Sequence, residues 1–224
     1  AVSETGEAKQ QDKHQSLSLS NMTFRYPSTK RDVLNSININ IKPGEKHALI
    51  GSSGSGKTTL LNQLIKQSDA GIMPQHLDFY NATVKENITM FNHFESEENQ
   101  INELLERFEL DHFNPDDYIT SAEYLSLGEK KRMHLIRMYI ENKNTWILDE
   151  PTASLNTRLR DKIWEEIFQK DTVLAATHDL SHLDRFDYVH YLEGGTIIES
   201  SSTEDALDHD GPVREAYRRY RDAL

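Results

Sequence analysis

The sequence contains no cysteine and no long apolar run in its 224 residues. The absence of cysteine excludes disulfide bonds, zinc sites built on thiolates and cysteine nucleophiles, and it fits a reducing cytoplasm. A membrane-spanning helix needs roughly 18 consecutive apolar residues, and no stretch of the chain approaches that length. We therefore expect the chain itself to be soluble.

Basic residues are scarce relative to acidic ones. The chain carries 25 Lys and Arg against 37 Asp and Glu, which gives a formal charge of −12. A surface of this sign repels nucleic acid, so we expect no nucleic-acid partner. The length suffices for one substantial core, or for one domain with a small appendage. The chain begins with Ala1 rather than Met, which is typical of a fragment or a processed product.

One stretch matches the pattern G-x-x-x-x-G-K-[ST] of a phosphate-binding loop at every fixed position. It comprises Gly51, Ser52, Ser53, Gly54, Ser55, Gly56, Lys57 and Thr58. A short buried strand is predicted before it and a helix after it, so backbone N–H groups and the positive end of the helix face an anion. Lys57 is expected to reach the β- and γ-phosphates of a nucleotide, and the Thr58 hydroxyl to bind Mg²⁺. The alternative is a Gly/Ser-rich turn with an unrelated lysine.

The hydrophobic pattern along the chain alternates between strands and helices. Strands are predicted at residues 17–26, with one shift of phase, and at residues 37–41, 47–50, 145–148 and 172–177. Helices are predicted at residues 59–65, 81–88, 101–108, 126–142, 159–168, 204–207 and 213–223. A hairpin is predicted where residues 188–192 and 196–198 flank Gly194 and Gly195. The pattern indicates an α/β fold with a mainly parallel sheet, preceded by a flexible tail at residues 1–16.

Further motifs follow the phosphate loop in a fixed order. They are Gln75 in Met73-Pro74-Gln75-His76, then Leu125-Ser126-Leu127-Gly128-Glu129, Asp149-Glu150-Pro151 with Ser154-Leu155-Asn156, and Thr177-His178-Asp179. With Tyr26 upstream, this series resembles the nucleotide-binding domain of the ATP-binding cassette (ABC) family over about residues 17–200. The resemblance implies a P-loop NTPase core with a mainly parallel sheet, a reduced antiparallel β subdomain and a helical signature subdomain at about residues 90–142. It also implies one ABC-type domain over residues 17–224.

The acidic pair and the histidine acquire roles through this resemblance. Asp149, at the end of a predicted strand, is suited to hold Mg²⁺ through water, and Glu150 to act as the general base for the attacking water. His178 resembles the switch histidine of the family, which contacts the γ-phosphate. The alternatives are acidic residues before a proline turn and a surface histidine. His178 and His182 also form an i, i+4 pair suited to zinc, but the sequence offers no third ligand.

Three residues outside the loop complete the predicted ATP-binding set. They are Thr59, which directly follows the loop, Gln75 and Tyr26. Gln75 resembles the family's glutamine that touches Mg²⁺ and couples to the membrane domain; the alternative is a turn glutamine. Tyr26 resembles the aromatic residue that stacks on adenine; the alternative is a tyrosine of the core. The stretch Phe79–Ile88 resembles exporter members, in which this region faces the transmembrane helices.

The signature segment departs from the family pattern Leu-Ser-Gly-Gly-Gln. In the family, the serine and the adjacent N–H groups bind the γ-phosphate held by the opposite subunit, and here the segment offers Ser126, Leu127, Gly128 and Glu129. Leu127 adds a side chain where a bare backbone is usual, and Glu129 replaces a neutral amide. Ser126 with Glu129 three residues later is also the signature of a capping box, and both interpretations are compatible.

Two other departures concern Asn156, where the family usually has Asp, and the length of residues 59–74. The family usually places several antiparallel strands between the phosphate loop and the glutamine. Sixteen residues cannot hold them. A reduced adenine-side subdomain is therefore expected.

The combined interpretation is an ATPase domain at the cytoplasmic face of the cell membrane, with ATP and Mg²⁺ as cofactors. It is expected to power a transporter, of exporter type, by ATP-driven dimerisation with a second nucleotide-binding domain, as a homodimer or a heterodimer. It is also expected to contact a transmembrane domain. An alternative is a nucleotide-gated interaction module that binds ATP and dimerises with little hydrolysis. A DNA-repair or chromosome ATPase would carry long coiled-coil arms, which are absent, and a P-loop kinase would not need residues 125–129.

Overall fold

The computed structural model describes residues 16–92 and 97–223. The flexible tail predicted for residues 1–16 lies outside the described residues, apart from Ser16. At the centre is a six-stranded sheet in the order β10-β9-β3-β8-β7-β4. Its strands are β3 (Lys46–Ile50), β4 (Gly71–Met73), β7 (Thr145–Asp149), β8 (Thr172–Ala176), β9 (Tyr188–Glu193) and β10 (Thr196–Ser202). All neighbours are parallel except the β9–β10 hairpin, which confirms the predicted mainly parallel sheet and the hairpin.

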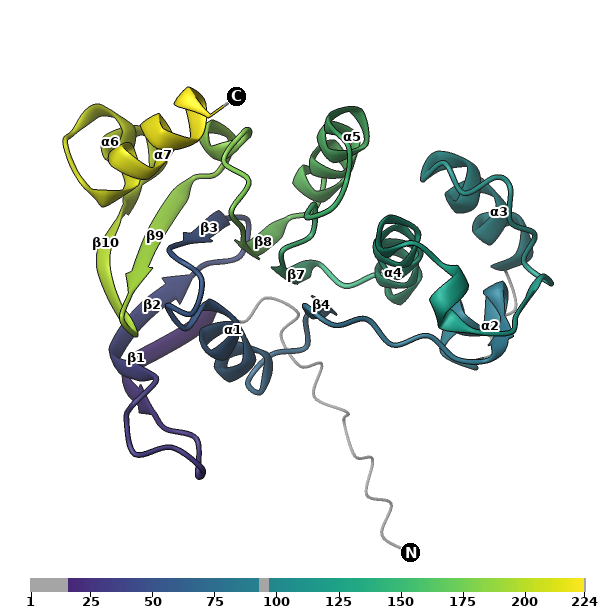
Figure 1. Cartoon of the computed structure of the whole chain (residues 1–224), viewed down its shortest axis with the longest axis horizontal. Coiled ribbons are helices and arrows are strands. Elements are labelled where there is room, and N and C mark those ends of the chain that lie inside the picture. The colour runs from purple at the N-terminus through teal and green to yellow at the C-terminus, as the bar shows by residue number, and fades with distance from the viewer. Residues whose placement is uncertain (1–15, 93–96, 224) are drawn as a thin grey trace, which may run out of the picture.

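Two hydrophobic clusters cover the two faces of this sheet. Leu49 of β3 packs in the cluster that includes the buried leucines of α1 (Lys57–Ile65). Its neighbours Ala48 and Ile50 pack in the other cluster, with α4 (Leu127–Glu141) and α5 (Thr157–Phe168). The alternation follows from the period of two in a strand. Figure 1 shows α1 and α5 on opposite sides of the sheet.

A two-stranded antiparallel sheet, β1 (Leu17–Phe24) and β2 (Leu34–Ile41), extends the cluster around α1. Its register shifts between Leu19 and Met22 and again before Phe24, where the sequence predicted an irregular strand. The strand ends at Phe24, so the predicted boundary at residue 26 is two residues too long. This small sheet agrees with the expected reduced β subdomain.

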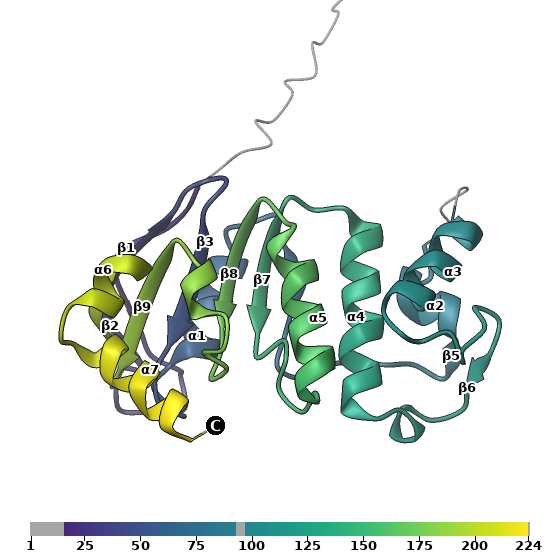
Figure 2. The same ribbon diagram turned by 90° about the horizontal axis from the view of Figure 1, so that it is seen from above.

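The middle of the chain forms a mostly helical region at the end of the molecule away from β1 and β2 (Figure 2). It contains β5 (Ala82–Thr83), α2 (Val84–Thr89), α3 (Glu97–Arg107), β6 (Tyr118–Ile119), a 3₁₀ turn (Ala122–Tyr124) and α4. The apolar face predicted for the third helical segment is buried, with Ile101 and Leu105 at its centre. The limits of a helical subdomain at residues 90–142 remain a prediction.

A 3₁₀ turn (Leu183–Arg185) precedes the β9–β10 hairpin, and α6 (Thr203–Asp208) and α7 (Pro212–Asp222) follow it. Both ends of α4, α6 and α7 lie within one residue of the predicted ends, and α5 begins two residues before its predicted start and ends where predicted. The sequence missed β4, β5 and β6, which have two or three residues each and therefore no period. Within the described residues, no helix combines the length and apolar character that crossing a membrane requires.

Candidate active site

The loop between β3 and α1 is held by the hairpin that follows it far along the chain. The Gly195 N–H donates to Ser55 O at 3.0 Å, and Gly195 O accepts from Asn35 N at 2.8 Å. Gly51 has φ +148°, and a Cβ there would lie 2.1 Å from Leu192 O, so this position requires glycine. The Ser55 hydroxyl is buried and has no hydrogen-bond partner among the described residues. The loop thus offers both backbone and a free hydroxyl to a ligand.

Lys57 begins α1 and is almost fully buried, with 7% of its surface exposed. Its Nζ donates to Gly51 O at 2.8 Å and to Ser52 O at 3.2 Å, and it lies 3.2 Å from His178 Nε2. Burial lowers the pKa of Lys57, while the nearby Glu150 and Asp149 oppose that shift. The ammonium group is therefore held over the loop, where the sequence predicted its contact with phosphate.

Thr58 and Asp149 meet at the carboxyl edge of the sheet. The Thr58 hydroxyl donates to Asp149 Oδ2 at 2.6 Å, and Asp149 is buried at the end of β7. Oxygen ligands of this kind suit Mg²⁺, so the pair fits the ion predicted here. Gln75 is exposed just beyond β4, and β4 is the neighbour of β7 in the sheet. The described residues contain no group of three or more His, Cys, Asp or Glu placed to hold a metal, so the zinc alternative gains no support.

Glu150 has a backbone conformation that is rare for a residue with a side chain. Its φ is +52°, and its N–H donates to Ala176 O at 2.9 Å. The Nζ of Lys131, a lysine of α4 that is 4% exposed, donates to Glu150 O and, at 2.9 Å, to Ala153 O. Non-glycine residues with positive φ gather at functional sites, where surrounding contacts hold them. Lys131 supplies such a contact here.

The Glu150 carboxylate faces His178. Its Oε2 accepts from the backbone N–H of His178 at 3.2 Å, and its Oε1 lies 3.5 Å from His178 Nε2. Oε1 is buried and accepts no hydrogen bond from any described residue. Burial raises the pKa of Glu150, against the attraction of His178 and Lys57. A carboxylate with a free oxygen and a raised pKa is suited to take a proton from water.

Tyr26 lies close to the start of α1 but outside the core. Its hydroxyl is 3.2 Å from Thr59 Oγ1, and its ring packs edge-on against Phe24 with centroids 4.9 Å apart. Tyr26 follows the end of β1 and is 39% exposed, so the alternative of a core strand tyrosine is wrong. The exposed ring leaves a face for a flat ligand next to the phosphate loop.

The signature segment forms the capping box that the sequence indicated. Ser126 Oγ accepts from Glu129 N at 3.2 Å, while Glu129 Oε2 accepts from Ser126 N at 2.8 Å and from Ser126 Oγ at 2.7 Å. His112 Nε2 lies 3.0 Å from Glu129 Oε1, and Leu127 is 45% exposed. In the parts of the chain that are described, no hydrogen bond joins this segment to the phosphate loop. It faces outward instead.

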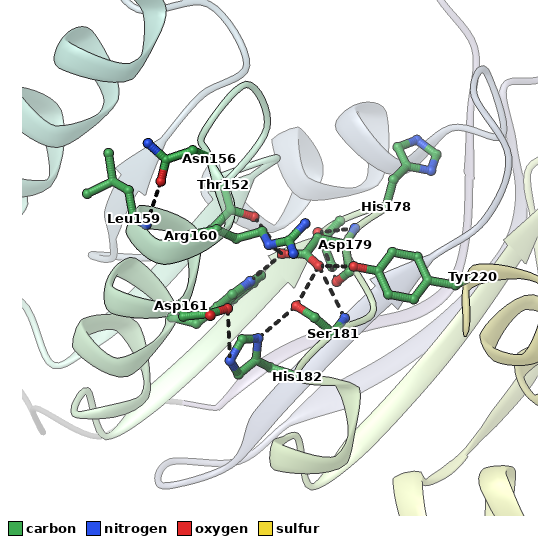
Figure 3. Close-up of polar contacts among 12 residues, drawn as sticks. Thr152, Asn156, Leu159, Arg160, Asp161, His178, Asp179, Ser181, His182 and Tyr220 are labelled. Atoms are coloured by element: carbon green, nitrogen blue, oxygen red, sulfur yellow. Dashed lines mark hydrogen bonds and ion pairs between the residues drawn. The ribbon is translucent and has the colours of Figure 1, made fainter. Parts of the chain in front are cut away.

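Asn156, one of the departures from the family pattern, caps α5. Its side-chain oxygen accepts from Leu159 N at 3.0 Å, as Figure 3 shows. Asn and Asp are equally good at this position, so the change to Asn leaves the start of the helix intact.

Two important positions were not found from the sequence. Lys131 has a signal, because it shares the buried face of α4 with Leu135 and Met138, where a lysine is unusual. Asp179 appeared only as the neighbour of His178. Its carboxylate joins several elements (Figure 3), a contact set that no local pattern announces.

The comparisons agree with this geometry. The family model described as "ABC transporter" matches residues 34–73 and 66–153, which together span more than half of the chain. The chain belongs to the ABC transporter family. The ATP-binding domains of this family are ATPases, and the chain corresponds to such a domain.

Curated relatives of this ABC domain are longer proteins. It is 28% identical, over 88% of its length, to the glutathione/L-cysteine transport system ATP-binding/permease protein CydC of Escherichia coli strain K12, of which it covers 40%. It is 29% identical, over 91% of its length, to an ATP-dependent lipid A-core flippase of Methylobacillus flagellatus, of which it covers 41%. The chain thus spans about two fifths of the length of these relatives.

A solved structure has the same fold. The chain of a bacterial Atm1-family ABC exporter with ATP bound superimposes with a TM-score of 0.82 over 92% of the present chain. The match covers 42% of that chain at 22% identity. It confirms the predicted P-loop NTPase core.

Proposed function

We propose that this ABC domain hydrolyses ATP, with Mg²⁺, to drive a membrane transporter of the exporter type. The observation that carries the proposal is the meeting of Lys57, His178 and Glu150, which belong to three different segments of the chain, beside the Thr58–Asp149 pair. The names of the relatives, a lipid A-core flippase among them, support the exporter assignment.

The phosphate chain of ATP is bound by the loop of residues 51–58 and by the Lys57 ammonium, which stabilises the charge that develops on the γ-phosphate. Thr58, Asp149 and Gln75 would hold Mg²⁺, which would neutralise phosphate charge there. The exposed ring of Tyr26 stacks on adenine. These roles follow the family pattern residue by residue and fit the placement of each side chain.

Hydrolysis uses Glu150 as the general base. Its Oε1, which accepts no hydrogen bond from the described residues, takes the proton of the attacking water. The raised pKa of Glu150 brings this carboxyl closer to neutral pH, where proton transfer is most effective. His178 contacts the γ-phosphate, because its ring lies next to both the Lys57 ammonium and the Glu150 carboxylate.

The signature segment serves a second nucleotide-binding domain. The outward-facing Ser126, Leu127, Gly128 and Glu129 contact the ATP bound by that partner, and two domains enclose two ATP molecules. Residues 17–224 form the domain, which docks on a transmembrane domain at the cytoplasmic face of the membrane. The helical region around α2 and α4 is the part that contacts it.

Phosphate release by the 224-residue chain with saturating Mg-ATP tests the proposal. Lys57→Ala is expected to weaken ATP binding by about tenfold or more, because it removes a charge-assisted contact. Glu150→Gln keeps the shape and is expected to bind Mg-ATP while turnover falls by about 10²–10⁴-fold. Matched controls are Lys42→Ala and Glu204→Gln, which change exposed residues away from the site. Parent-like turnover in Glu150→Gln would show that Glu150 is not the base.

A nucleotide-gated interaction module is the second candidate. It is favoured by the Ser126 hydroxyl, which donates to Glu129 at 2.7 Å instead of pointing freely at a partner's phosphate. This candidate predicts that the parent chain binds ATP and dimerises, with phosphate release no faster than that of Glu150→Gln. The same assay therefore separates the two functions.

A further inference from the structure

The carboxylate of Asp179, directly after the switch histidine, accepts five hydrogen bonds. Its Oδ1 accepts from Ser181 N at 3.1 Å, from Ser181 Oγ at 2.6 Å and from Tyr220 OH at 2.7 Å. Its Oδ2 accepts from Thr152 Oγ1 at 3.1 Å and from Trp164 Nε1 at 2.8 Å. Figure 3 shows these bonds converging on one side chain. A carboxylate has about four lone-pair sites, so this one is saturated.

The bonds come from four separate parts of the fold. Thr152 lies in the turn after Glu150, Trp164 in α5, Ser181 in the loop after β8 and Tyr220 in α7. Burial raises the pKa of Asp179, but the hydrogen bonds from Ser181, Trp164 and Tyr220 outweigh burial and bring the pKa to about 2. The group is therefore ionised at any pH at which the enzyme works, and its bonds are charge-assisted.

The position of Asp179 fixes the residue before it. His178 is exposed over about half of its side chain, and its own contacts are with Lys57 at 3.2 Å and Glu150 at 3.2 and 3.5 Å. Besides its own N–H bond to Glu150 Oε2, the backbone of His178 is held through both neighbours: Thr177 N donates to Leu49 O at 3.2 Å, and Asp179 is bound as described above. A movement of Asp179 thus moves the His178 ring relative to the γ-phosphate site.

Tyr220 brings the C-terminal helix into this arrangement. α7 is anchored at its first turn by Val213, which is fully buried and whose N–H donates to Glu199 Oε2 at 2.9 Å. Tyr220 lies two turns further along, close to the end of the helix. Its hydroxyl donates to Asp179, which lies 41 residues earlier in the sequence. α7 is therefore fixed at one end to the β10 strand and at the other to the switch loop.

We propose that Tyr220 is a positioning residue for ATP hydrolysis. Through its hydrogen bond to Asp179, it holds His178 in the position that catalysis requires. This inference rests on the proposed function, in which His178 contacts the γ-phosphate. It makes α7 part of the catalytic machinery, because the helix can tighten or release the switch histidine without touching ATP. An error of about 1 Å in the placement of a catalytic group is enough to reduce a rate substantially.

The variant Tyr220→Phe tests the hydroxyl alone, since the ring and its packing stay. We expect kcat for ATP hydrolysis to fall about three- to tenfold, with KM for ATP unchanged, because the loop of residues 51–58 still binds the nucleotide. The matched control is Tyr217→Phe, one turn earlier on α7, whose hydroxyl contacts Arg221 and not the switch loop. It is expected to behave as the parent does.

A background variant separates positioning from general loosening. In a His178→Ala chain, Tyr220→Phe should lower kcat no further, because the residue through which it acts is gone. An equal loss in both backgrounds would overturn the proposal, and so would a kcat of Tyr220→Phe equal to that of the parent. A thermal unfolding midpoint close to the parent's establishes that the variant is folded.

A second measurement does not depend on turnover. Magnetic resonance of isotope-labelled histidine rings resolves the ten histidines of the chain, and His178→Ala identifies the His178 signal. Tyr220→Phe is expected to shift or broaden the His178 ring signal, and Tyr217→Phe to leave it in place. An unmoved His178 signal in Tyr220→Phe would contradict the inference. Absence of Glu150-dependent turnover in the parent would count against the proposed function instead, and the ring signal would still decide the role of Tyr220.

Discussion

The helices α1 and α4 both begin at a motif associated with phosphate, yet their first turns are built differently. α1 has Gly56 as its N-cap, with no side-chain cap and no acidic residue in the first turn. α4 has Ser126 as its N-cap and a complete capping box, with Glu129 in the first turn. Free N–H groups at a helix start attract anions, whereas a carboxylate already placed there satisfies the same donors and repels a second anion.

The difference indicates which half of an ATP site each helix can supply alone. At α1 the charged partners come from the same chain: Lys57, Asp149 and Glu150 lie around the loop. At α4 the chain presents an exposed Leu127 and a self-bonded Ser126. The charged groups of the half-site at α1 thus all come from this chain, while the segment at α4 depends on rearrangement or on a tolerant partner. The following predictions test that contrast.

The largest effect is expected from Gly51→Ala. The new Cβ would lie 2.1 Å from Leu192 O at a φ of +148°, so the loop must move, and we expect stability to fall by at least about 3 kcal/mol, with loss of ATP binding. Gly128→Ala is the counterpart at α4. There the Cβ would meet only the end of the Leu155 side chain at 3.1 Å, so stability should change by less than about 1 kcal/mol. Urea unfolding and ATP titration of both variants check the contrast.

Acidification should destabilise the fold through two buried histidines, one in α4 and one in β9. Burial lowers the pKa of His134 in α4 and of His190 in β9 to about 4, so in the folded state both remain neutral well below pH 6.5. The unfolded chain binds these protons near pH 6.5, so the free energy of unfolding is greatest above that pH. It should decline towards pH 4, by up to about 3 kcal/mol for each histidine.

His190→Gln and His134→Gln, measured by urea unfolding across the same pH range, should each flatten part of this decline. His190 lies 2.9 Å from His47 and from the Ser200 hydroxyl, so its replacement also removes a like-charge neighbour in acid. A pH profile with unchanged slope in both variants would mean that other groups, such as the carboxylates, cause the acid loss.

A smaller loss of stability is expected from removing the contact between α4 and the turn at Glu150. Lys131→Met removes the ammonium group that binds Glu150 O and Ala153 O, so both carbonyls lose a charged donor. We expect a loss of about 2 kcal/mol in unfolding free energy and slower turnover, because the positive φ of Glu150 is no longer supported. Lys130→Met, the adjacent lysine, is the control. If the two variants are equally stable and active, α4 does not brace the catalytic turn.

The smallest effect concerns the signature itself. The double change Leu127→Gly with Glu129→Gln restores a bare backbone and a neutral amide, which can still close the capping box. We expect steady-state phosphate release at high protein concentration to rise about two- to threefold, since one repulsive charge near the partner's nucleotide is removed. An unchanged rate, with folding and ATP affinity intact, would show that the departures are tolerated. A homodimer would then suffice, without a different chain that carries the usual Gly-Gly-Gln.

The sequence predicted the half of the site that depends on local order. The loop of residues 51–58 and the strand ends at Asp149 and His178 are set by short patterns, and a parallel sheet brings such ends to one edge. β3, β8 and β7 do lie side by side, so these residues meet. Gln75 was identified only through its resemblance to the family's glutamine, because the three-residue strand before it was too short to detect.

The sequence could not predict contacts that single side chains make between distant parts of the fold. Nothing in the residues around Tyr220 distinguishes it from Tyr217, yet one reaches Asp179 and the other Arg221. Side-chain partners of this kind follow from tertiary packing, whereas helical periodicity predicts only which residues share a face of the helix.

The contact between Gly195 and the Ser55 carbonyl has a consequence for the order in which the protein matures on the ribosome. The phosphate loop emerges about 140 residues before the hairpin turn that braces it. Synthesis at about 5–20 residues per second makes this an interval of roughly ten to thirty seconds. During that time the loop lacks its brace, so tight ATP binding should begin only after the β9–β10 hairpin has left the exit tunnel.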